Sequence, residues 1–408
     1  MKRIVAFVLL LVFVLTAFAS CSKNEKKKDA KFDLVSTADP TYDYYHNDLS
    51  LYITVSREDY ANLTVSLDIT DKEVEDYLND HLLPSYRTPN LITGQAVKDG
   101  DTVYLWYTGY IDDVAFEGGS NAESERPSAL VIGSNTFIDT FESQLIGVIP
   151  ENTSWESPKV VNVTFPDSYG NADLAGKAAR FDVVVAGVFD GTYTVPELTA
   201  EFARNINNFT PTTDDPVAEF KLALKDWLRE QAAADLESRK FNCLIEKLFS
   251  TLTFSGSVPQ VSGIRETARI EEKLNDSATG YYQQSNLYYY MTYQQVLFDS
   301  LDDAARYYFN LRFDADWQAY IASYAYKAIK QLLVLNAVAQ LEGVEITEQD
   351  VKNWIRDQVD ASDDESTTVE SFLESYSLEE IYAQIACERA REILLEKVTF
   401  DATGLPTD

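Results

Sequence analysis

Few side chains in this sequence are of the types that carry out acid–base, nucleophilic or metal chemistry. The 408 residues include two histidines, His46 and His81, and three cysteines, Cys21, Cys243 and Cys387. Two histidines provide few ligands for a zinc site and few bases for a histidine-based triad. Three cysteines cannot form a disulfide scaffold. No P-loop, G-x-S-x-G or G-x-G-x-x-G run occurs. The sequence therefore predicts a function that uses no metal and no cofactor.

The charge balance excludes a further class of partner. Acidic residues outnumber basic ones by 66 to 34, so the formal net charge is −32. A surface of this sign repels the phosphate backbone of nucleic acids. The composition, with 45% hydrophobic and 25% charged residues, is that of a globular protein. We therefore expect a folded protein of two to three domains, at about 150 residues per domain, that binds no nucleic acid.

The first residues have the pattern of an export signal. Basic residues at 2–3 precede an apolar run over 4–18, which is shorter than the ~20 residues that a membrane-spanning helix needs. Small residues then lead directly into Cys21, an arrangement that resembles a bacterial lipoprotein box. The resemblance implies removal of a signal peptide over 1–20 and lipidation of Cys21. An ordinary secretory signal with a chance cysteine is the alternative.

Residues 21–48 show little periodicity and predict a flexible tether behind the lipid. Lysines cluster near its start, and basic residues beside an acyl anchor add attraction to anionic lipids. The sequence thus predicts a protein that is lipid-anchored to the cell membrane and faces the extracytoplasmic side.

The most informative pattern lies between residues 97 and 189. Runs of β-branched and aromatic residues, separated by turns rich in glycine, proline and aspartate, predict strands over 103–107, 129–132, 159–165 and 179–188. One short helical stretch is expected over 137–145. Strands with a single small helix predict a compact α+β domain of about 90 residues, which we place at 96–190.

Several motifs follow one another in this block. They are G-D-T-V-Y-L-W-Y-T-G-Y from Gly100, F-E-G-G from Phe116, F-I-D-T-F-E from Phe137, F-P-D-S-Y-G from Phe165 and L-A-G-K-A-A-R-F from Leu174. Together they resemble the FKBP family of peptidyl-prolyl cis-trans isomerases, and most of all the isomerase domain of the trigger factor family. The resemblance implies an antiparallel FKBP-like β half-barrel wrapped on one short helix.

The resemblance also implies which residues form a catalytic cleft. The walls and floor of the cleft would come from Tyr107, Phe116, Phe137, Ile138, Phe141, Tyr169 and Phe181, with Leu130 adding to the wall as a substrate-binding residue. The Ile138 backbone N–H and the Tyr169 hydroxyl would hold substrate carbonyls. Glu117 would orient the substrate without transferring a proton. Thr140 stands where the family usually has a glycine in the short helix.

The resemblance extends over about residues 50–400. Residues 49–95 look like the strand and helix segment that enters the isomerase domain, and we expect them to pack near the helical domain. Residues 191–408 are similar to the all-α chaperone arms of trigger factor and SurA-like proteins, so the expected fold class is α+β. The family begins with a ribosome-docking domain that carries a G-F-R-x-G-K type loop. No such run occurs in this sequence, and we expect no ribosome binding.

Short sequence patterns in these regions predict where several helices begin. T-x-x-E after Thr70, T-x-x-D after Thr347 and S-x-x-E after Ser377 predict capped helix starts. From Pro216 to Phe249 no proline or glycine intervenes, which predicts one helix about 50 Å long.

Tyrosines are unusually dense between residues 281 and 326. Tyrosine combines an apolar ring with a polar tip, which suits an adaptable surface that stays soluble. We expect Tyr288, Tyr289 and Tyr324 to bind client polypeptides. Packing between helices is the alternative for any single tyrosine.

These features predict a membrane-anchored extracytoplasmic peptidyl-prolyl cis-trans isomerase and chaperone for secreted proteins. Its partners would be unfolded or proline-containing secreted polypeptides, and holding them needs no ATP. Two alternatives stay open. One is a catalytically weak, ATP-independent holdase that binds clients through the same cleft and arms. The other is a surface adhesion or scaffold protein.

Overall fold

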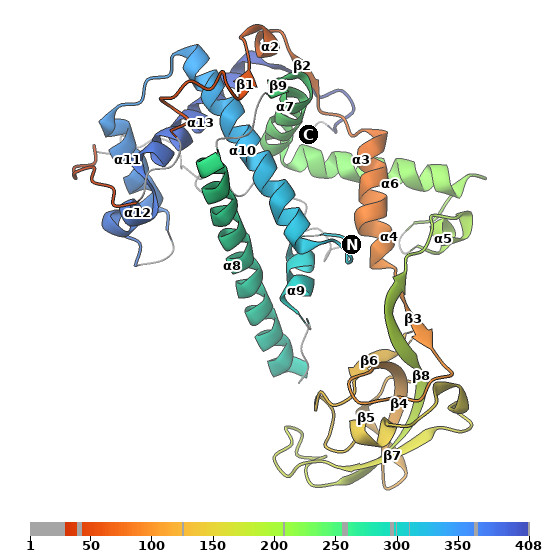
Figure 1. The fold of residues 1–408 in the computed structure, drawn as a ribbon. Helices are drawn as coiled ribbons and strands as arrows, with labels where there is room; N and C mark the ends of the chain where they lie inside the picture. Colours follow the sequence, from red (N-terminus) through yellow and green to blue (C-terminus); the bar gives the residue numbers. More distant parts are fainter. Residues whose placement is uncertain are drawn as a thin grey trace. The chain divides into compact units, whose positions relative to one another are not determined.

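The computed structural model describes residues 29–38, 43–124, 126–206, 209–254, 260–293, 298, 300–309, 311–362 and 366–406. The chain divides into two compact units, drawn in Figure 1. The sheet unit comprises residues 82–198 and 286–297, and the helical unit comprises the rest. The predicted signal peptide over 1–20 and the predicted lipidation site Cys21 lie outside the described residues.

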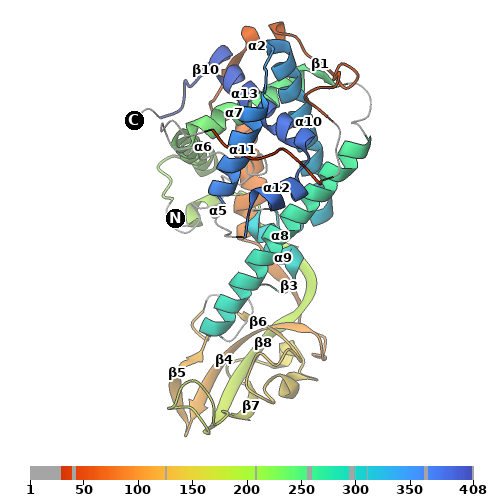
Figure 2. The same ribbon diagram turned by 90° about the vertical axis from the view of Figure 1, so that its left-hand side faces the viewer.

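One antiparallel six-stranded sheet forms the sheet unit. Its strands are β3 (Thr88–Ile92), β4 (Thr102–Ile111), β5 (Val114–Ser120), β6 (Ser128–Val131), β7 (Lys159–Thr164) and β8 (Ala178–Thr194). They follow the order β3-β8-β4-β5, with β6 also paired to β4 and β7 also paired to β8. Figure 2 shows the long strands β4 and β8 side by side. Strand β8 is central because it pairs with three others.

Alternating apolar residues explain which face of this sheet is buried. Val103 and Leu105 in β4, and Phe181, Val183 and Val185 in β8, are all buried, because successive side chains of a strand point to opposite faces. A short α-helix, α4 (Leu83–Ser85), precedes β3. The helical stretch expected over 137–145 is shorter than predicted. It consists of bends and turns followed by a 3-10 helix over Glu142–Leu145, and a second 3-10 helix spans Pro150–Asn152.

Two short strand pairs connect distant parts of the helical unit. Strand β1 (Ile53–Thr54) pairs antiparallel with β9 (Thr253–Phe254), and β2 (Thr64–Ser66) pairs parallel with β10 (Thr399–Asp401). Buried residues of these segments share one core with α7 (Leu236–Thr251), α10 (Trp317–Glu342) and α13 (Leu378–Lys397). Tyr60 and Leu67 are fully buried in that core. The chain before the sheet unit is therefore part of the helical core.

The remaining helices are α2 (Glu58–Ala61), α3 (Asp71–Tyr77), α5 (Ala200–Asn205), α6 (Pro216–Ala234), α8 (Gln260–Tyr293), α9 (Leu301–Tyr308), α11 (Glu348–Asp360), α12 (Val369–Ser375) and a π-helix over Leu78–Leu82. Thr70, Thr347 and Ser377 begin α3, α11 and α13 with both hydrogen bonds of a capping box, so these predicted helix starts are confirmed. None of the described helices combines the length and the apolar character needed to cross a membrane.

The prediction of a single helix over 216–249 is wrong. Helix α6 ends at Ala234 and α7 begins at Leu236, because Asp235 leaves the helical conformation with φ −131° and ψ 66°. Its side chain accepts a hydrogen bond from the Ser238 N–H at 3.3 Å. An aspartate that satisfies a free N–H of the first turn is a favoured helix start, so the chain breaks and restarts here without glycine or proline.

Part of the predicted flexible tether packs on the helical unit. Ala30 is buried, and the Ser36 hydroxyl donates to the Leu373 carbonyl at 3.0 Å. Further along, Tyr44 and Leu49 are buried in the main helical core. The structure therefore differs from the tether prediction wherever it describes residues 29–48, because apolar side chains there find a surface to cover.

Candidate active site

Aromatic side chains from three adjacent strands meet on the buried face of the sheet unit. The ring of Phe181 in β8 lies 6.0 Å from that of Tyr107 in β4 and 5.9 Å from that of Phe116 in β5, measured between centroids. The strand register explains the meeting, because Gly109 of β4 lies directly opposite Phe181 and offers no side chain between the rings. Pairing of the strands thus brings together residues that are far apart in the sequence.

The segment between β6 and β7 adds two more rings. Phe137 lies 4.8 Å from Phe141 and 5.7 Å from Tyr107, and Phe141 lies 5.4 Å from Phe181. The last two contacts are edge-to-face, the arrangement that aromatic quadrupoles favour. Ile138, between the two phenylalanines, is half-buried against the same core.

Exposure separates a buried floor from an accessible rim. Phe141, Phe181 and Leu130 form the floor, with 0%, 5% and 3% of their surfaces exposed. Tyr107, Phe116, Phe137 and Ile138 are half-buried around it, Tyr169 is 40% exposed, and Glu117 is exposed. The structure therefore brings the predicted aromatic residues into one cluster, while Glu117 adjoins the cluster through its neighbour Phe116.

Two polar groups of the cleft, the Tyr107 hydroxyl and the Ile138 N–H, can donate hydrogen bonds. Burial raises the pKa of Tyr107, with a smaller contribution from Tyr169, so the Tyr107 hydroxyl stays protonated at neutral pH. The Ile138 N–H donates to no protein acceptor within the described ranges. An apolar pocket with a few free donors can bind a peptide and orient its carbonyl groups.

Two residues of this site were missed in the sequence. Phe165 is buried, and its ring lies 5.8 Å from Phe116 and 4.7 Å from Tyr169, which links Tyr169 to the cluster. Its place in the F-P-D-S-Y-G run was the available signal. Glu142 is a buried carboxylate that, among the described residues, accepts its hydrogen bonds from residues 133–137. It ends the F-I-D-T-F-E run, but nothing in that run indicates that its carboxylate is buried.

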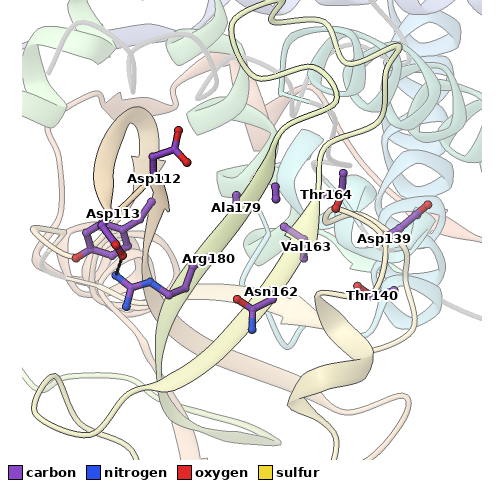
Figure 3. A pocket seen from close by; sticks show the side chains of 11 residues that line it. Asp112, Asp113, Asp139, Thr140, Asn162, Val163, Thr164, Ala179 and Arg180 are labelled. Atoms are coloured by element: carbon purple, nitrogen blue, oxygen red, sulfur yellow. Dashed lines mark ion pairs between the residues drawn. The ribbon is translucent and has the colours of Figure 1, made fainter.

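A separate cavity of about 560 Å³ adjoins the aromatic cleft. Figure 3 shows Asp112 and Asp113 on one side, Asp139 on the other, and Arg180 between them, with a guanidinium nitrogen 3.6 Å from an Asp113 oxygen. Three carboxylates against one guanidinium make its lining acidic. The cavity shares none of its lining residues with the aromatic cluster, and Thr140 on its wall has φ +74°.

The predicted client-binding tyrosines differ in exposure. Tyr288 in α8 is 69% exposed, whereas Tyr324 in α10 is half-buried with its ring 6.0 Å from Tyr320. Tyr289 also lies in α8, but its side chain is outside the described residues. Tyr324 belongs to an extended series of ring contacts that joins α8, α9 and α10 through Tyr281, Phe298, Tyr307, Tyr308, Phe309, Trp317 and Tyr320.

Two of the three cysteines lie in the described part of the helical unit. Cys387 is buried in the helical core, where its sulfur accepts a hydrogen bond from the Asn336 side-chain amide at 3.2 Å, and Cys243 is half-buried; these two cysteines form no disulfide. Among the described residues, no group of three or more His, Cys, Asp or Glu side chains is placed to hold a metal ion.

Comparison with known proteins identifies relatives for the sheet unit and for most of the chain. The family profile of FKBP-type peptidyl-prolyl cis-trans isomerases matches residues 93–186, which contain the whole aromatic cluster. The trigger factor of Clostridioides difficile is 31% identical over 337 residues, which are 81% of this chain and 69% of that protein. The trigger factor of Agathobacter rectalis is 28% identical over 342 residues, with 83% and 69% covered.

Coverage of the relatives is partial. The trigger factor of Clostridium acetobutylicum is 29% identical over 288 residues, and the match takes in 71% of this chain but 58% of that protein. A solved structure of the trigger factor chaperone is 17% identical and covers 85% of this chain and 73% of its own, with a TM-score of 0.23. A similarity at that score supports no conclusion about the fold.

Proposed function

The chain belongs to the trigger factor family, and from this membership we propose that it is a peptidyl-prolyl cis-trans isomerase and chaperone that assists protein folding. The aromatic cluster carries this proposal, because it lies within the residues that match the FKBP-type isomerase profile. The fold has the expected α+β class, with a curved antiparallel sheet in one unit and helices in the other.

The cleft suits a reaction that needs no proton transfer. Amide resonance sets a barrier of about 18–20 kcal/mol to rotation of the prolyl bond, and uncatalysed isomerisation takes tens to hundreds of seconds. An apolar floor of Phe141 and Phe181 removes water from the imide and so favours the twisted state, in which resonance is lost. Lowering the barrier by about 4 kcal/mol would accelerate the rotation roughly a thousandfold.

Rim groups would hold the peptide while the bond turns. The Ile138 N–H has no acceptor among the described residues and is free to bind a substrate carbonyl. The exposed Tyr169 ring places its hydroxyl at the edge of the same cluster. Glu117 is exposed beside Phe116, which suits an orienting role.

Tyrosines of α8, α9 and α10 would supply client binding. The ring contacts among α8, α9 and α10 leave Tyr307 61% exposed. Tyr288, in the part of α8 that belongs to the sheet unit, is 69% exposed. Aromatic rings with polar tips can cover apolar segments of an unfolded chain. We propose that Tyr288, Tyr289 and Tyr324 bind client polypeptides, and that clients are held without ATP.

The cellular setting is also a proposal and rests on the sequence. The basic start, the short apolar run and the small residues before Cys21 support export and lipidation. We propose that the protein is anchored to the cell membrane, faces the extracytoplasmic side, and assists secreted polypeptides without docking on ribosomes. Radiolabelled fatty acid incorporated into wild type but not into Cys21→Ala would support the anchor, and equal labelling would refute it.

Proline-limited refolding of a model client tests the catalytic proposal. The purified chain should accelerate the slow refolding phase, and Tyr169→Phe should lower the acceleration because the ring stays and only the hydroxyl is lost. Phe181→Ala should lower it further by opening the floor of the cleft. Unchanged rates in both folded variants would contradict the assigned site.

The same assay separates isomerase from holdase. A chain that leaves the refolding phase unchanged but suppresses client aggregation would be the ATP-independent holdase. A chain that neither accelerates refolding nor suppresses aggregation would refute both the isomerase and the holdase function.

A further inference from the structure

A buried carboxylate organises the loop that leads into the cleft. Glu142 begins the 3-10 helix after Phe141, and 6% of its surface is exposed. One of its oxygens accepts from the Gly133 N–H at 2.8 Å and the Asn135 N–H at 3.0 Å. The other accepts from the backbone N–H groups of Thr136 and Phe137, at 3.0 and 3.1 Å, and from the Ser134 hydroxyl at 3.2 Å.

The negative charge of Glu142 is balanced by backbone amides. Across the described ranges no lysine or arginine lies within ion-pair distance of this carboxylate. Gly133 and Asn135 have φ values of +92° and +56°, so the loop wraps around the carboxylate in an uncommon conformation. Successive N–H groups that converge in this way form an anion-binding nest. Here the anion is part of the chain itself.

The nest ends where the cleft begins. Phe137 donates its N–H to Glu142, and its ring packs on Tyr107 and Phe141. The next N–H along the chain, that of Ile138, has no acceptor in the described part of the structure. Glu142 itself directly follows Phe141, which is fully buried in the floor. One carboxylate therefore links the loop that bears Ile138 to the segment that bears Phe141.

We propose that Glu142 is a positioning residue of the isomerase site. Its carboxylate holds residues 133–137 so that the Phe137 ring closes the cleft and the Ile138 N–H points to the substrate carbonyl. This inference rests on the proposed isomerase function. It assigns to Glu142 no contact with substrate and no proton transfer.

Three single substitutions in the full chain test the proposal. Glu142→Gln keeps the shape of the side chain but replaces one acceptor oxygen with an NH2 group. That NH2 group is itself a donor, so it cannot accept the hydrogen bonds of the surrounding N–H groups. Glu142→Asp keeps both oxygens on a shorter side chain. Glu123→Gln removes an exposed carboxylate of the same unit and serves as the control. Each is assayed on an Ala-Leu-Pro-Phe peptide at a low temperature, with the rate divided by the folded fraction from near-ultraviolet circular dichroism.

We expect Glu142→Gln to lower kcat/KM about 10- to 100-fold, because a displacement near 1 Å can cost about two orders of magnitude. Glu142→Asp should recover part of the loss, and Glu123→Gln should match wild type. Amide hydrogen exchange in Glu142→Gln should speed up at residues 133–137 and stay slow in β4 and β8. A folded Glu142→Gln variant within twofold of wild type would overturn the proposal.

These experiments distinguish a wrong role for Glu142 from a wrong assignment of isomerase activity to the chain. An inactive wild-type chain would refute isomerase activity. Glu142 would then be judged by the affinity of the same peptide for wild type and Glu142→Gln, measured by calorimetry. At least tenfold weaker binding to the variant would support positioning by Glu142, and equal or undetectable binding to both proteins would overturn it.

Discussion

Replacing Gly109 by alanine is the sharpest steric test of the cleft. Gly109 is buried in β4, opposite Phe181. A Cβ atom at this position would lie 2.6 Å from a ring carbon of Phe181 and 2.7 Å from two ring carbons of Phe116. The φ of Gly109 is not positive, so its backbone conformation is open to alanine. The substitution therefore acts only by pushing two cleft rings apart.

The size of the effect follows from these distances. Non-bonded carbon atoms rest at about 3.5–4.0 Å, so each ring must retreat by roughly 1 Å. Both rings are packed against further aromatic rings, and overpacking of this kind costs about 1–3 kcal/mol. For a domain of about 100 residues, each kcal/mol lowers the unfolding midpoint by about 4–8 °C. A 1 Å shift in the cleft should also lower kcat/KM about 10- to 100-fold.

Calorimetry and the peptide assay measure the two effects. Gly94→Ala is the matched control, because its Cβ would meet an oxygen of Glu151 at an ordinary 3.7 Å and its φ is also not positive. We expect Gly94→Ala to keep wild-type activity and stability. A Gly109→Ala variant with the midpoint and activity of Gly94→Ala would refute the steric account of the cleft.

Three further outcomes are expected. Thr140→Gly should raise the free energy of unfolding by about 1 kcal/mol in urea, because a β-branched residue is strained at φ +74°; a lower value would contradict this. The pKa of Glu342 is lowered to about 2, chiefly by a hydrogen bond from Lys397, so this carboxylate stabilises the fold above its ordinary pKa of 4.5. Urea stability should therefore fall from pH 4.5 toward 2, and less so in Glu342→Gln; identical profiles would count against this pair. Finally, Tyr307→Ser should weaken aggregation suppression while the control Leu222→Ser, at a similar 63% exposure, does not. Equal losses of aggregation suppression in the two variants would contradict a specific role of the Tyr307 ring in client binding.

Local signals predicted helix starts well. The capping boxes at Thr70, Thr347 and Ser377 all form, because the atoms involved lie within three residues of one another. The break at Asp235 was also locally encoded, since Asp-x-x-Ser is a capping pattern. It was missed because helix-forming residues continue on both sides of Asp235.

Tertiary structure decided features that no short pattern encodes. Residues 29–38 and 43–48 lack periodicity, yet they pack where the helical unit offers apolar surface and free carbonyls. Glu142 is one of many acidic residues, and its burial becomes favourable only when five donors of one loop converge on it. Phe165 joins the cleft because β7 pairs with β8 and carries the following chain toward Phe116.

The sequence by itself determined the aromatic composition of the predicted cleft and the positions where the capped helices α3, α11 and α13 begin, and it favoured the class of chemistry that we propose. These properties depend on residue type and short spacing, which a single chain displays directly. Only the tertiary structure decided which rings are floor and which are rim, which N–H groups are taken and which stay free, and which glutamate is buried. Those properties depend on contacts between residues that are distant in the sequence, and these contacts form only when strands pair and the core packs.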